Sequence, residues 1–379
     1  MQRRALLKAG LAGSLAAPAL APGLRAQGGW PNKTVRFVVP FAPGGGTDTV
    51  SRLICDQLSR AFGQQFVIDN KGGAGGNIGT VEIARAAPDG YTLGLISVAS
   101  HTLNPMLYSK LPYDPDKDIV AISRVAILAN LLGLTQSVPA NNVSELIALC
   151  KKSPGKYSFA SSGPGTSLHL SGELFKSLAE VDIVHVPYKG AGPAYNDVIS
   201  GTVHMMFANM PSMLPQVRGG KLKGLGVTSA ERSKTAPDIP AIGETVKGYV
   251  ATSWYGVGAP AATPEPIVAK LEAAIGEALK QPEIQKRWAD DLGLDVPPAG
   301  RSGLKEFIDD DRKLWAPAVK ASGVKLDFST PGAVAFEQLA DLYISLGGSA
   351  SPANYTNYTN CTNHTTCNTY RTTFTTPSM

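Results

Sequence analysis

The chain has 379 residues, of which 43% are hydrophobic and only 17% are charged, with a formal net charge of +5. A chain of this length can bury a large core and suggests two domains. Four of the basic residues lie in the first 26 positions, and no basic stripe is interleaved with aromatic residues, which excludes a nucleic-acid partner. The 40 glycines and 28 prolines suit the short connections of an α/β protein.

An export signal is predicted over residues 1–26. A basic start is followed by a small, apolar run from Ala9 to Ala21, and small or polar residues before position 27 suit a processing site. The pair Arg3-Arg4 is typical of a twin-arginine signal, although both the Sec and the twin-arginine routes stay open. No later run reaches the roughly 18 apolar residues that a membrane helix needs. We therefore expect a soluble protein in the periplasm.

The first βα unit after this signal carries a glycine-rich turn. A buried strand is predicted at Val35–Val39, and apolar residues recur at helical spacing over Val50–Phe62. Between them lies Gly44-Gly-Gly46, followed by Thr47 or Asp48 as the expected N-cap. Glycines let the backbone approach a ligand closely, and the N–H groups at a helix start favour an anion. A connection that merely needs a tight turn is the alternative.

Strands and helices continue to alternate up to about residue 132, which predicts a largely parallel sheet covered by helices. The expected elements here are the strands Gln65–Asp69 and Tyr91–Ser97 and the helix Thr80–Ala87. Glycines in the loop 71–79 have the spacing Gly-x-Gly-x-x-x-Gly, which is not the dinucleotide fingerprint, so no nucleotide cofactor is expected. The long apolar strand Ser123–Leu134 is expected to carry the chain out of the first domain.

A second βα series follows, with another glycine turn. The expected helices are Val143–Lys152, Ser167–Ala179 and one that ends near Ile199, and the expected strands are Tyr157–Ser162, Val181–Val186, Thr202–Ala208 and Gly224–Thr228. The turn Gly163-Pro-Gly-Thr-Ser167 joins a strand to a helix start and carries hydroxyl side chains. In open α/β sheets, ligands bind at the carboxyl ends of strands. One such turn in each domain predicts a cleft whose walls grip a carboxylate, and two unrelated structural turns are the alternative.

The strand Thr252–Ala259 is expected to carry the chain back to the first domain. Two amphipathic helices that should pack on that domain and a final helix follow, at Pro264–Lys280, Pro282–Asp290 and Gly303–Ala321. The predicted domains are thus 27–132 together with 251–327, and 133–250. The polar tail at 328–379, with its repeated Asn-x-Thr, is predicted to be low-complexity disorder and receives no function.

Catalytic motifs find little support in this sequence. There is no Gly-x-Ser-x-Gly elbow, no His-Glu-x-x-His and no phosphate-loop lysine, and neither a metal nor a cofactor is expected. His169 lies beside the second glycine turn, where a binding role and a packing role both fit. His185 and His204 are expected to be packing residues in strands. Cys55 and Cys150 are expected to be small core residues within helices.

Several motifs in order along the chain resemble those of a known family. They are Pro40-Phe-Ala-Pro-Gly-Gly-Gly-Thr-Asp48, Asn70-Lys-Gly-Gly-Ala-Gly-Gly-Asn-Ile-Gly79, Ser161-Ser-Gly-Pro-Gly-Thr-Ser-Leu-His169 and Val186-Pro-Tyr-Lys-Gly-Ala191. They are similar to motifs of the Bug-type solute receptors, the extracytoplasmic binding proteins of the tripartite tricarboxylate transporter family. The similarity runs from about Trp30 to Asp327. It implies a type II periplasmic-binding-protein fold, with two α/β domains, a ligand cleft between them and two crossover strands.

The resemblance also implies a function and a set of ligand contacts. Family members capture small carboxylates without chemical change, so the expected partners are a small-molecule carboxylate and the transporter's membrane subunits, and we expect a monomer. The matching positions are Phe41, Gly45, Gly46, Thr47, Asp48, Gly165, Thr166, Ser167, His169 and Asn209. The family has an aspartate before that asparagine, whereas this chain has Ala208, so the ligand class can differ.

Asp48 is the one acid among the expected contacts, and a carboxylate there would repel an anionic ligand. Either it caps its helix and faces away, or it meets an ammonium or hydroxyl group of the ligand. Two other functions stay open: an enzyme in the same cleft, in which Thr166 or Ser167 would act with His169, and a receptor that feeds a signalling partner. The sequence does not name the ligand.

Overall fold

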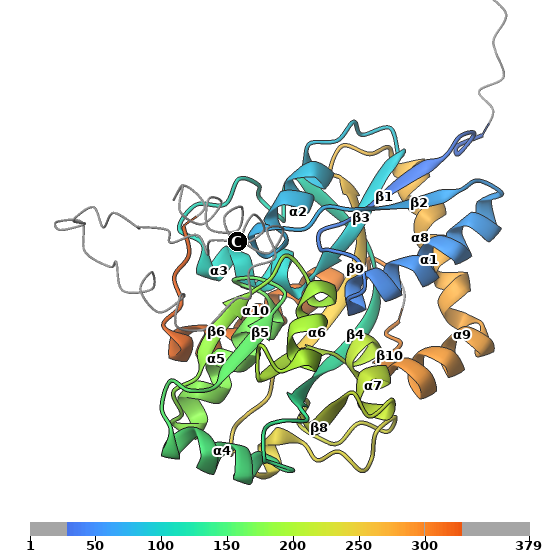
Figure 1. Ribbon diagram of the computed structural model, residues 1–379. Coiled ribbons are helices and arrows are strands. Elements are labelled where there is room, and N and C mark those ends of the chain that lie inside the picture. Colours follow the sequence, from blue (N-terminus) through green and yellow to red (C-terminus); the bar gives the residue numbers. More distant parts are fainter. Residues whose placement is uncertain (1–28, 299, 328–379) are drawn as a thin grey trace, which may run out of the picture.

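The computed structural model of the protein describes residues 29–298 and 300–327. Within these residues ten strands form one sheet, in the order β2-β1-β3-β9-β4-β7-β5-β6, with β8 and β10 (Leu294–Asp295) also paired to β4. Figure 1 shows two lobes, the first around β1–β3 and the second around β5–β7, with β4 and β9 passing between them. The predicted signal and tail lie outside the described residues.

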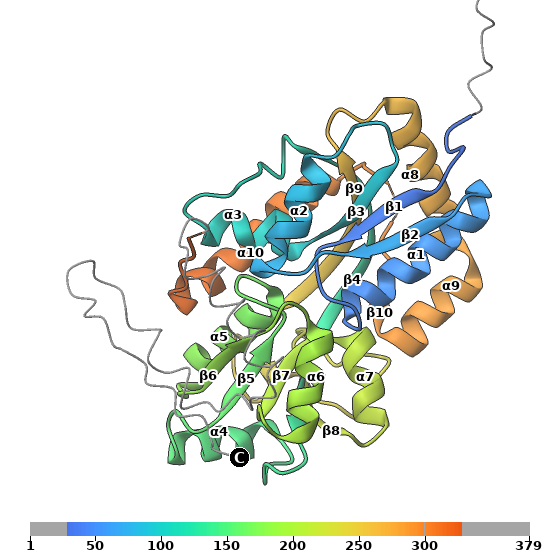
Figure 2. The same cartoon turned by 45° about the horizontal axis from the view of Figure 1, so that its top comes forward.

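The first lobe has a parallel sheet with helices on both faces. Strand β1 (Val35–Val39) lies between β2 (Phe66–Asn70) and β3 (Thr92–Ser97). Alternate residues of β1 face opposite sides: Phe37 packs in the cluster of Ile54 from α1 (Gly46–Phe62), and Val38 packs with Ile83 from α2 (Asn77–Ala84). Helices α8 (Glu265–Lys280) and α9 (Pro282–Lys286) complete the layer beside α1, as Figure 2 shows.

The second lobe repeats this arrangement on a smaller scale. Strand β5 (Ser158–Ser161) lies between β6 (Val184–Pro187) and β7 (Met205–Asn209), all parallel, and β8 (Leu222–Val227) runs antiparallel to β4. Its helices are α4 (Val143–Lys152), α5 (Ser167–Ala179), α6 (Ala191–Ser200) and α7 (Met210–Arg218). The carboxyl ends of its strands face the first lobe (Figure 2). The predicted glycine turns lie at this boundary between the lobes.

Two long antiparallel strands connect the lobes. Strand β4 (Ile119–Thr135) pairs with β9 (Thr252–Pro260) in its first part and with β7 and β8 in its second part. The expected outward and return crossovers are thus present. Helix α10 (Leu304–Ser322) packs both against α5 and against the π-helical turn Ala99–Leu103 of the first lobe, so it touches both lobes. The predicted domain limits stay a prediction.

Most predicted elements are present, and some of their bounds differ from the prediction. The helices Val143–Lys152 and Ser167–Ala179 have the predicted bounds. The N-cap of α1 is Gly45, so the prediction of Thr47 or Asp48 as the N-cap was wrong. Helix α2 starts at Asn77, three residues before its predicted start, and His204 lies just before β7 rather than inside a strand.

Two helices were not predicted at all. Helix α7 contains Pro211 and Pro215, which look like helix breakers in a sequence. However, Pro211 lies in the first turn, where its missing N–H is not needed. The short α3 (Asn104–Leu107) follows the π-helical turn directly and has no polar N-cap to mark it. Among the described residues, no helix is long and apolar enough to cross a membrane.

Candidate ligand-binding site

Each of the two predicted glycine turns lies against the opposite lobe. A β-carbon on Gly75, beside the second-lobe turn, would lie 1.9 Å from the carbonyl oxygen of Pro164. One on Gly192 of α6 would lie equally close, at 1.9 Å, to the carbonyl oxygen of Pro43 beside the first-lobe turn. Only glycine permits such approaches of two backbones. The structure is therefore a closed form, in which the lobes touch along the carboxyl ends of their strands.

The first-lobe turn forms one wall of this seam. The backbone N–H of Ala42 donates to the carbonyl oxygen of Lys189 across the seam, at 3.1 Å. Gly45 faces the start of α6, and a β-carbon on Gly46 would lie 2.7 Å from the Cβ of Asn209. The N–H groups in the first turn of α1 have no carbonyl partner within the helix, and they lie at this wall. The wall thus offers backbone donors to an anion.

The structure brings Asp48 to a position that the sequence left undecided. One carboxylate oxygen accepts from the backbone N–H of Gly44 at 3.2 Å, and the amide of Asn70 donates to the other at 3.2 Å. The guanidinium of Arg52 donates to both oxygens, each at 3.0 Å. Asp48 is 6% exposed. Its carboxylate is therefore occupied by groups of its own lobe, beneath the glycine turn.

The second-lobe turn is held by its own side chains. Thr166 is the N-cap of α5: its hydroxyl accepts from the backbone N–H of His169 at 3.3 Å and donates to the carbonyl oxygen of Gly163 at 2.7 Å. The backbone N–H of Gly165 donates to Nδ1 of His169 at 3.2 Å. An accepting Nδ1 requires the neutral ring, and burial lowers the pKa of His169 to about 3. His169 thus supports the turn that Ser167 follows.

His169 belongs to a stack of rings behind the turn. Its ring lies 4.0 Å from that of His185, which in turn lies 4.9 Å from the ring of Phe159. The Nε2 of His185 is 2.6 Å from the hydroxyl of Ser161, and burial lowers the pKa of His185 as well. His185 is therefore a packing residue, as predicted. Burial keeps both histidines neutral, and the stack fixes the rear of the second wall.

Asn209 lies at the base of the seam, in a chain of buried hydrogen bonds. Its amide donates to the side-chain oxygen of Asn130 at 2.7 Å, and its own oxygen accepts from the hydroxyl of Tyr255 at 2.7 Å. Asn130 continues the chain to the hydroxyl of Ser171 at 3.0 Å. Sequence reasoning missed Asn130 and Tyr255. A polar residue inside each crossover strand was the signal that could have found them.

A second polar cluster reaches the seam from the first lobe, and it was missed too. The amide of Asn104 donates to the side-chain oxygen of Asn77 at 2.8 Å, which also accepts from the hydroxyl of Tyr113 at 3.1 Å. The oxygen of Asn104 lies against the second-lobe turn, 2.5 Å from where a β-carbon of Gly165 would be. These amides supply neutral polar groups beside the second-lobe glycine turn.

The chemistry of the site is that of binding through neutral donors. Phe41, whose ring lies over Gly76, is buried and closes the apolar side of the first wall. The hydroxyl of Thr166 is bonded to a carbonyl oxygen and Nδ1 of His169 to a backbone amide, so they do not form a nucleophile and base. In the described part of the chain, no group of three or more His, Cys, Asp or Glu could hold a metal ion.

Comparison with known proteins gives one family. A family model described as the tripartite tricarboxylate transporter family receptor matches residues 50–324. The protein BugT of Bordetella pertussis is 35% identical over 300 residues, which cover 78% of this chain and 91% of BugT. The match therefore includes both lobes.

Two solved structures are similar at 35% identity. One is R. palustris Rpa4515 with adipate, which has a TM-score of 0.75 and covers 78% of this chain and 99% of that one. The other is MatC (Rpa3494) from Rhodopseudomonas palustris with bound malate, which has a TM-score of 0.72 and covers 76% of this chain and 99% of that one. These likenesses confirm the predicted fold class.

Proposed function

The chain is a Bug-type member of the tripartite tricarboxylate transporter receptor family, and we propose that it captures a small carboxylate between its lobes for the membrane subunits of such a transporter. The observation that carries this proposal is that both glycine turns lie at the seam between the lobes, each against a segment of the opposite lobe: Pro43 meets Gly192, and Pro164 meets Gly75. Each turn precedes a helix start, and each offers N–H or hydroxyl donors rather than fixed positive charge. A carboxylate accepts several hydrogen bonds from such donors. The family members and the structural neighbours are binding proteins and not enzymes.

We divide the ten predicted site residues into two groups. Those proposed to face the ligand are Phe41, Gly45, Gly46, Thr47, Gly165, Thr166 and Ser167. The other three, Asp48, His169 and Asn209, have their polar atoms bonded to their own surroundings, which supports a role in holding the walls. The hydroxyl of Thr166 caps its helix, so its backbone N–H is the group we assign to the ligand.

The neutral walls favour a ligand that brings its own charge. Adipate and malate, the molecules named with the two structural neighbours, are both dicarboxylates. We therefore infer that a small dicarboxylate is the first class to test, with one carboxylate at the start of α1 and the other end towards the start of α5. The export signal predicted at residues 1–26 and the receptor family support the periplasm as the location. We propose a monomer, because one chain supplies both walls.

Thermal unfolding with a ligand panel tests this function. A ligand that binds only the folded state stabilises it by RT ln(1 + [L]/Kd), about 2.7 kcal/mol at 100 times Kd. The panel contains adipate, malate, succinate, citrate, benzoate and glutamate, with glucose as the neutral control. We expect a raised melting temperature with at least one carboxylate and none with glucose. A protein that melts identically with every member does not have the proposed function.

A further inference from the structure

Three side chains beneath the first-lobe turn connect it to the outer surface of the lobe. They are Asp48, Arg52 and Asn70, which we call the Asp48 tripod. Asp48 accepts from the N–H of Gly44 on one oxygen and from Asn70 on the other, while Arg52 donates to both. The Asn70 amide also donates to the carbonyl oxygen of Phe41 at 3.0 Å. The tripod therefore binds the loop at Phe41 and at Gly44.

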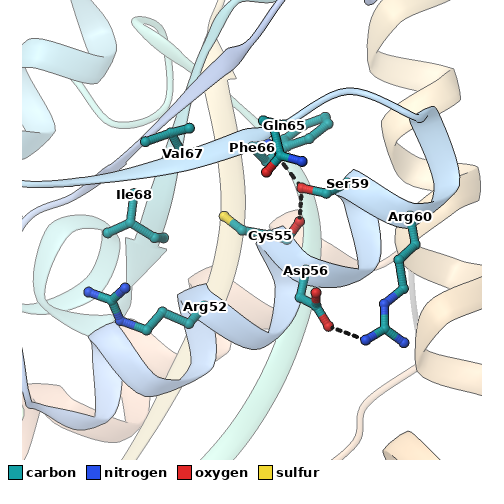
Figure 3. A pocket seen from close by; sticks show the side chains of 9 residues that line it. All are labelled: Arg52, Cys55, Asp56, Ser59, Arg60, Gln65, Phe66, Val67 and Ile68. Atoms are coloured by element: carbon teal, nitrogen blue, oxygen red, sulfur yellow. Dashed lines mark hydrogen bonds and ion pairs between the residues drawn. The ribbon is translucent and has the colours of Figure 1, made fainter.

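The cation of the tripod is not in the ligand cleft. Arg52 extends from the outer face of α1 along a surface pocket of about 580 Å³ between α1 and β2, which Figure 3 shows. Its side chain is 57% exposed, whereas that of Asp48 is 8% exposed. A second ion pair lies on the same helix, between Asp56 and Arg60 at 2.9 Å with the same i,i+4 spacing. That pair does not reach the glycine turn.

We propose that Asp48 and Arg52 are positioning residues of the ligand site, which hold the first-lobe turn and cancel the acid's charge without touching the ligand. A buried carboxylate under an anion-binding turn would repel the ligand, because charges are poorly screened in a dry site. The bidentate guanidinium neutralises it. The carboxylate accepts from the Gly44 N–H, and in this proposal the N–H groups of Gly45 and Gly46 serve the ligand. This inference rests on the proposed function.

The two roles give an unusual order of affinities. Arg52→Gln leaves the acid charged and uncompensated, so we expect affinity for the best-binding panel member to fall about tenfold, the equivalent of one charge-assisted hydrogen bond. In the double variant Asp48→Asn with Arg52→Gln the charge is gone, so binding should recover towards wild type. Asp48→Asn alone leaves Arg52 unpaired and should change affinity less than Arg52→Gln. Arg52→Gln should weaken every carboxylate of the panel that the wild type binds.

Isothermal titration calorimetry measures these affinities, with Arg60→Gln and Asp56→Asn as matched controls on the same helix. The controls should stay within about twofold of wild type, because exposed i,i+4 pairs contribute little. Urea unfolding without ligand verifies that each variant folds. An affinity of Arg52→Gln equal to wild type, or a double variant weaker than Arg52→Gln, overturns the inference. A loss confined to amine-bearing ligands in Asp48→Asn also overturns it, because Asp48 would then contact the ligand.

A ligand-free measurement separates this inference from the proposed function. If wild type binds no panel member, the proposed function fails, but hydrogen exchange at the Gly44 amide still tests positioning. We expect faster exchange of that amide in Arg52→Gln than in Arg60→Gln, because its acceptor loses its anchor. Equal exchange in the two variants contradicts the positioning role.

Discussion

A single methyl group at Gly192 should prevent the lobes from closing. The β-carbon of Gly192→Ala would lie 1.9 Å from the carbonyl oxygen of Pro43 in the other lobe, and real β-carbons essentially never approach within 3.0 Å. The seam must therefore open by about an ångström. The three atoms nearest to that β-carbon all belong to Pro43 and Gly44 of the first lobe, so the added methyl group clashes only across the seam. The open form should therefore remain well folded.

The variant should bind its ligand more weakly because the added methyl group destabilises the closed form. Overpacking costs about 1–3 kcal/mol, and the Ala42 hydrogen bond to Lys189, at 3.1 Å, adds about 1 kcal/mol when broken. A penalty of about 2–4 kcal/mol on the binding-competent form lowers affinity about 30- to 1,000-fold. The cause is the reduced population of the closed form, since the donors to the ligand are unchanged.

Isothermal titration calorimetry with the best-binding carboxylate measures this loss, and urea unfolding without ligand measures the stability of the variant. Gly29→Ala is the control, because a β-carbon there meets no atom within 4 Å. Small-angle scattering should show that the wild type contracts with ligand while Gly192→Ala does not. A folded Gly192→Ala protein that binds with wild-type affinity would refute the reasoning that closure over the ligand requires this seam.

Three further predictions concern stability and reactivity. Burial lowers the pKa of His169 to about 3 from its ordinary 6.5, so the unfolded chain takes up a proton below pH 6.5 and stability falls as the pH drops towards 3. This group should make the free energy of unfolding, measured with urea, about 2 kcal/mol lower at pH 5 than at pH 7. The variant His169→Asn should show a smaller difference between the two pH values. A difference equal to that of wild type counts against a neutral His169 ring. Tyr255→Phe leaves the Asn209 oxygen without its donor and should lower the free energy of unfolding, measured with urea, by about 1–3 kcal/mol. An unchanged free energy of unfolding would mean that this hydrogen bond is absent. Burial raises the pKa of Cys55 and Cys150, so peptide mapping after iodoacetamide treatment at pH 8 should find both unmodified in the native protein, and rapid labelling of either contradicts its burial.

The two second-lobe helices with correct bounds had local signals. Asn142 and Thr166 are N-caps whose side chains accept a hydrogen bond from a backbone N–H three residues later. The start of each helix is therefore determined by residues that are close in sequence. Helix α7 lacked such a signal, because its N-cap Asn209 is bonded elsewhere and two prolines follow. The starts of these two helices could therefore be predicted from local caps.

The site depended on contacts that no local pattern records. The glycine turns were visible in the sequence, but the role of Asp48 was not, because one of its partners, Asn70, lies at the end of β2, 22 residues away. Another partner, Arg52, is one helical turn away, and the sequence alone does not show that its guanidinium is directed back to the acid. The hydrogen bond between Tyr255 and Asn209 joins positions 46 residues apart. Such pairings are fixed by the packing of the lobes.

A crystal structure of the protein with the carboxylate that gives the largest thermal shift tests the central claim most directly. The account predicts a carboxylate between the lobes, with oxygens about 2.7–3.2 Å from backbone N–H groups of Gly45–Thr47. It also predicts contacts with Gly165–Ser167 on the other wall, and the Asp48 carboxylate still bonded to Arg52. A carboxylate bound outside this seam, or lobes that stay apart around it, would contradict the account.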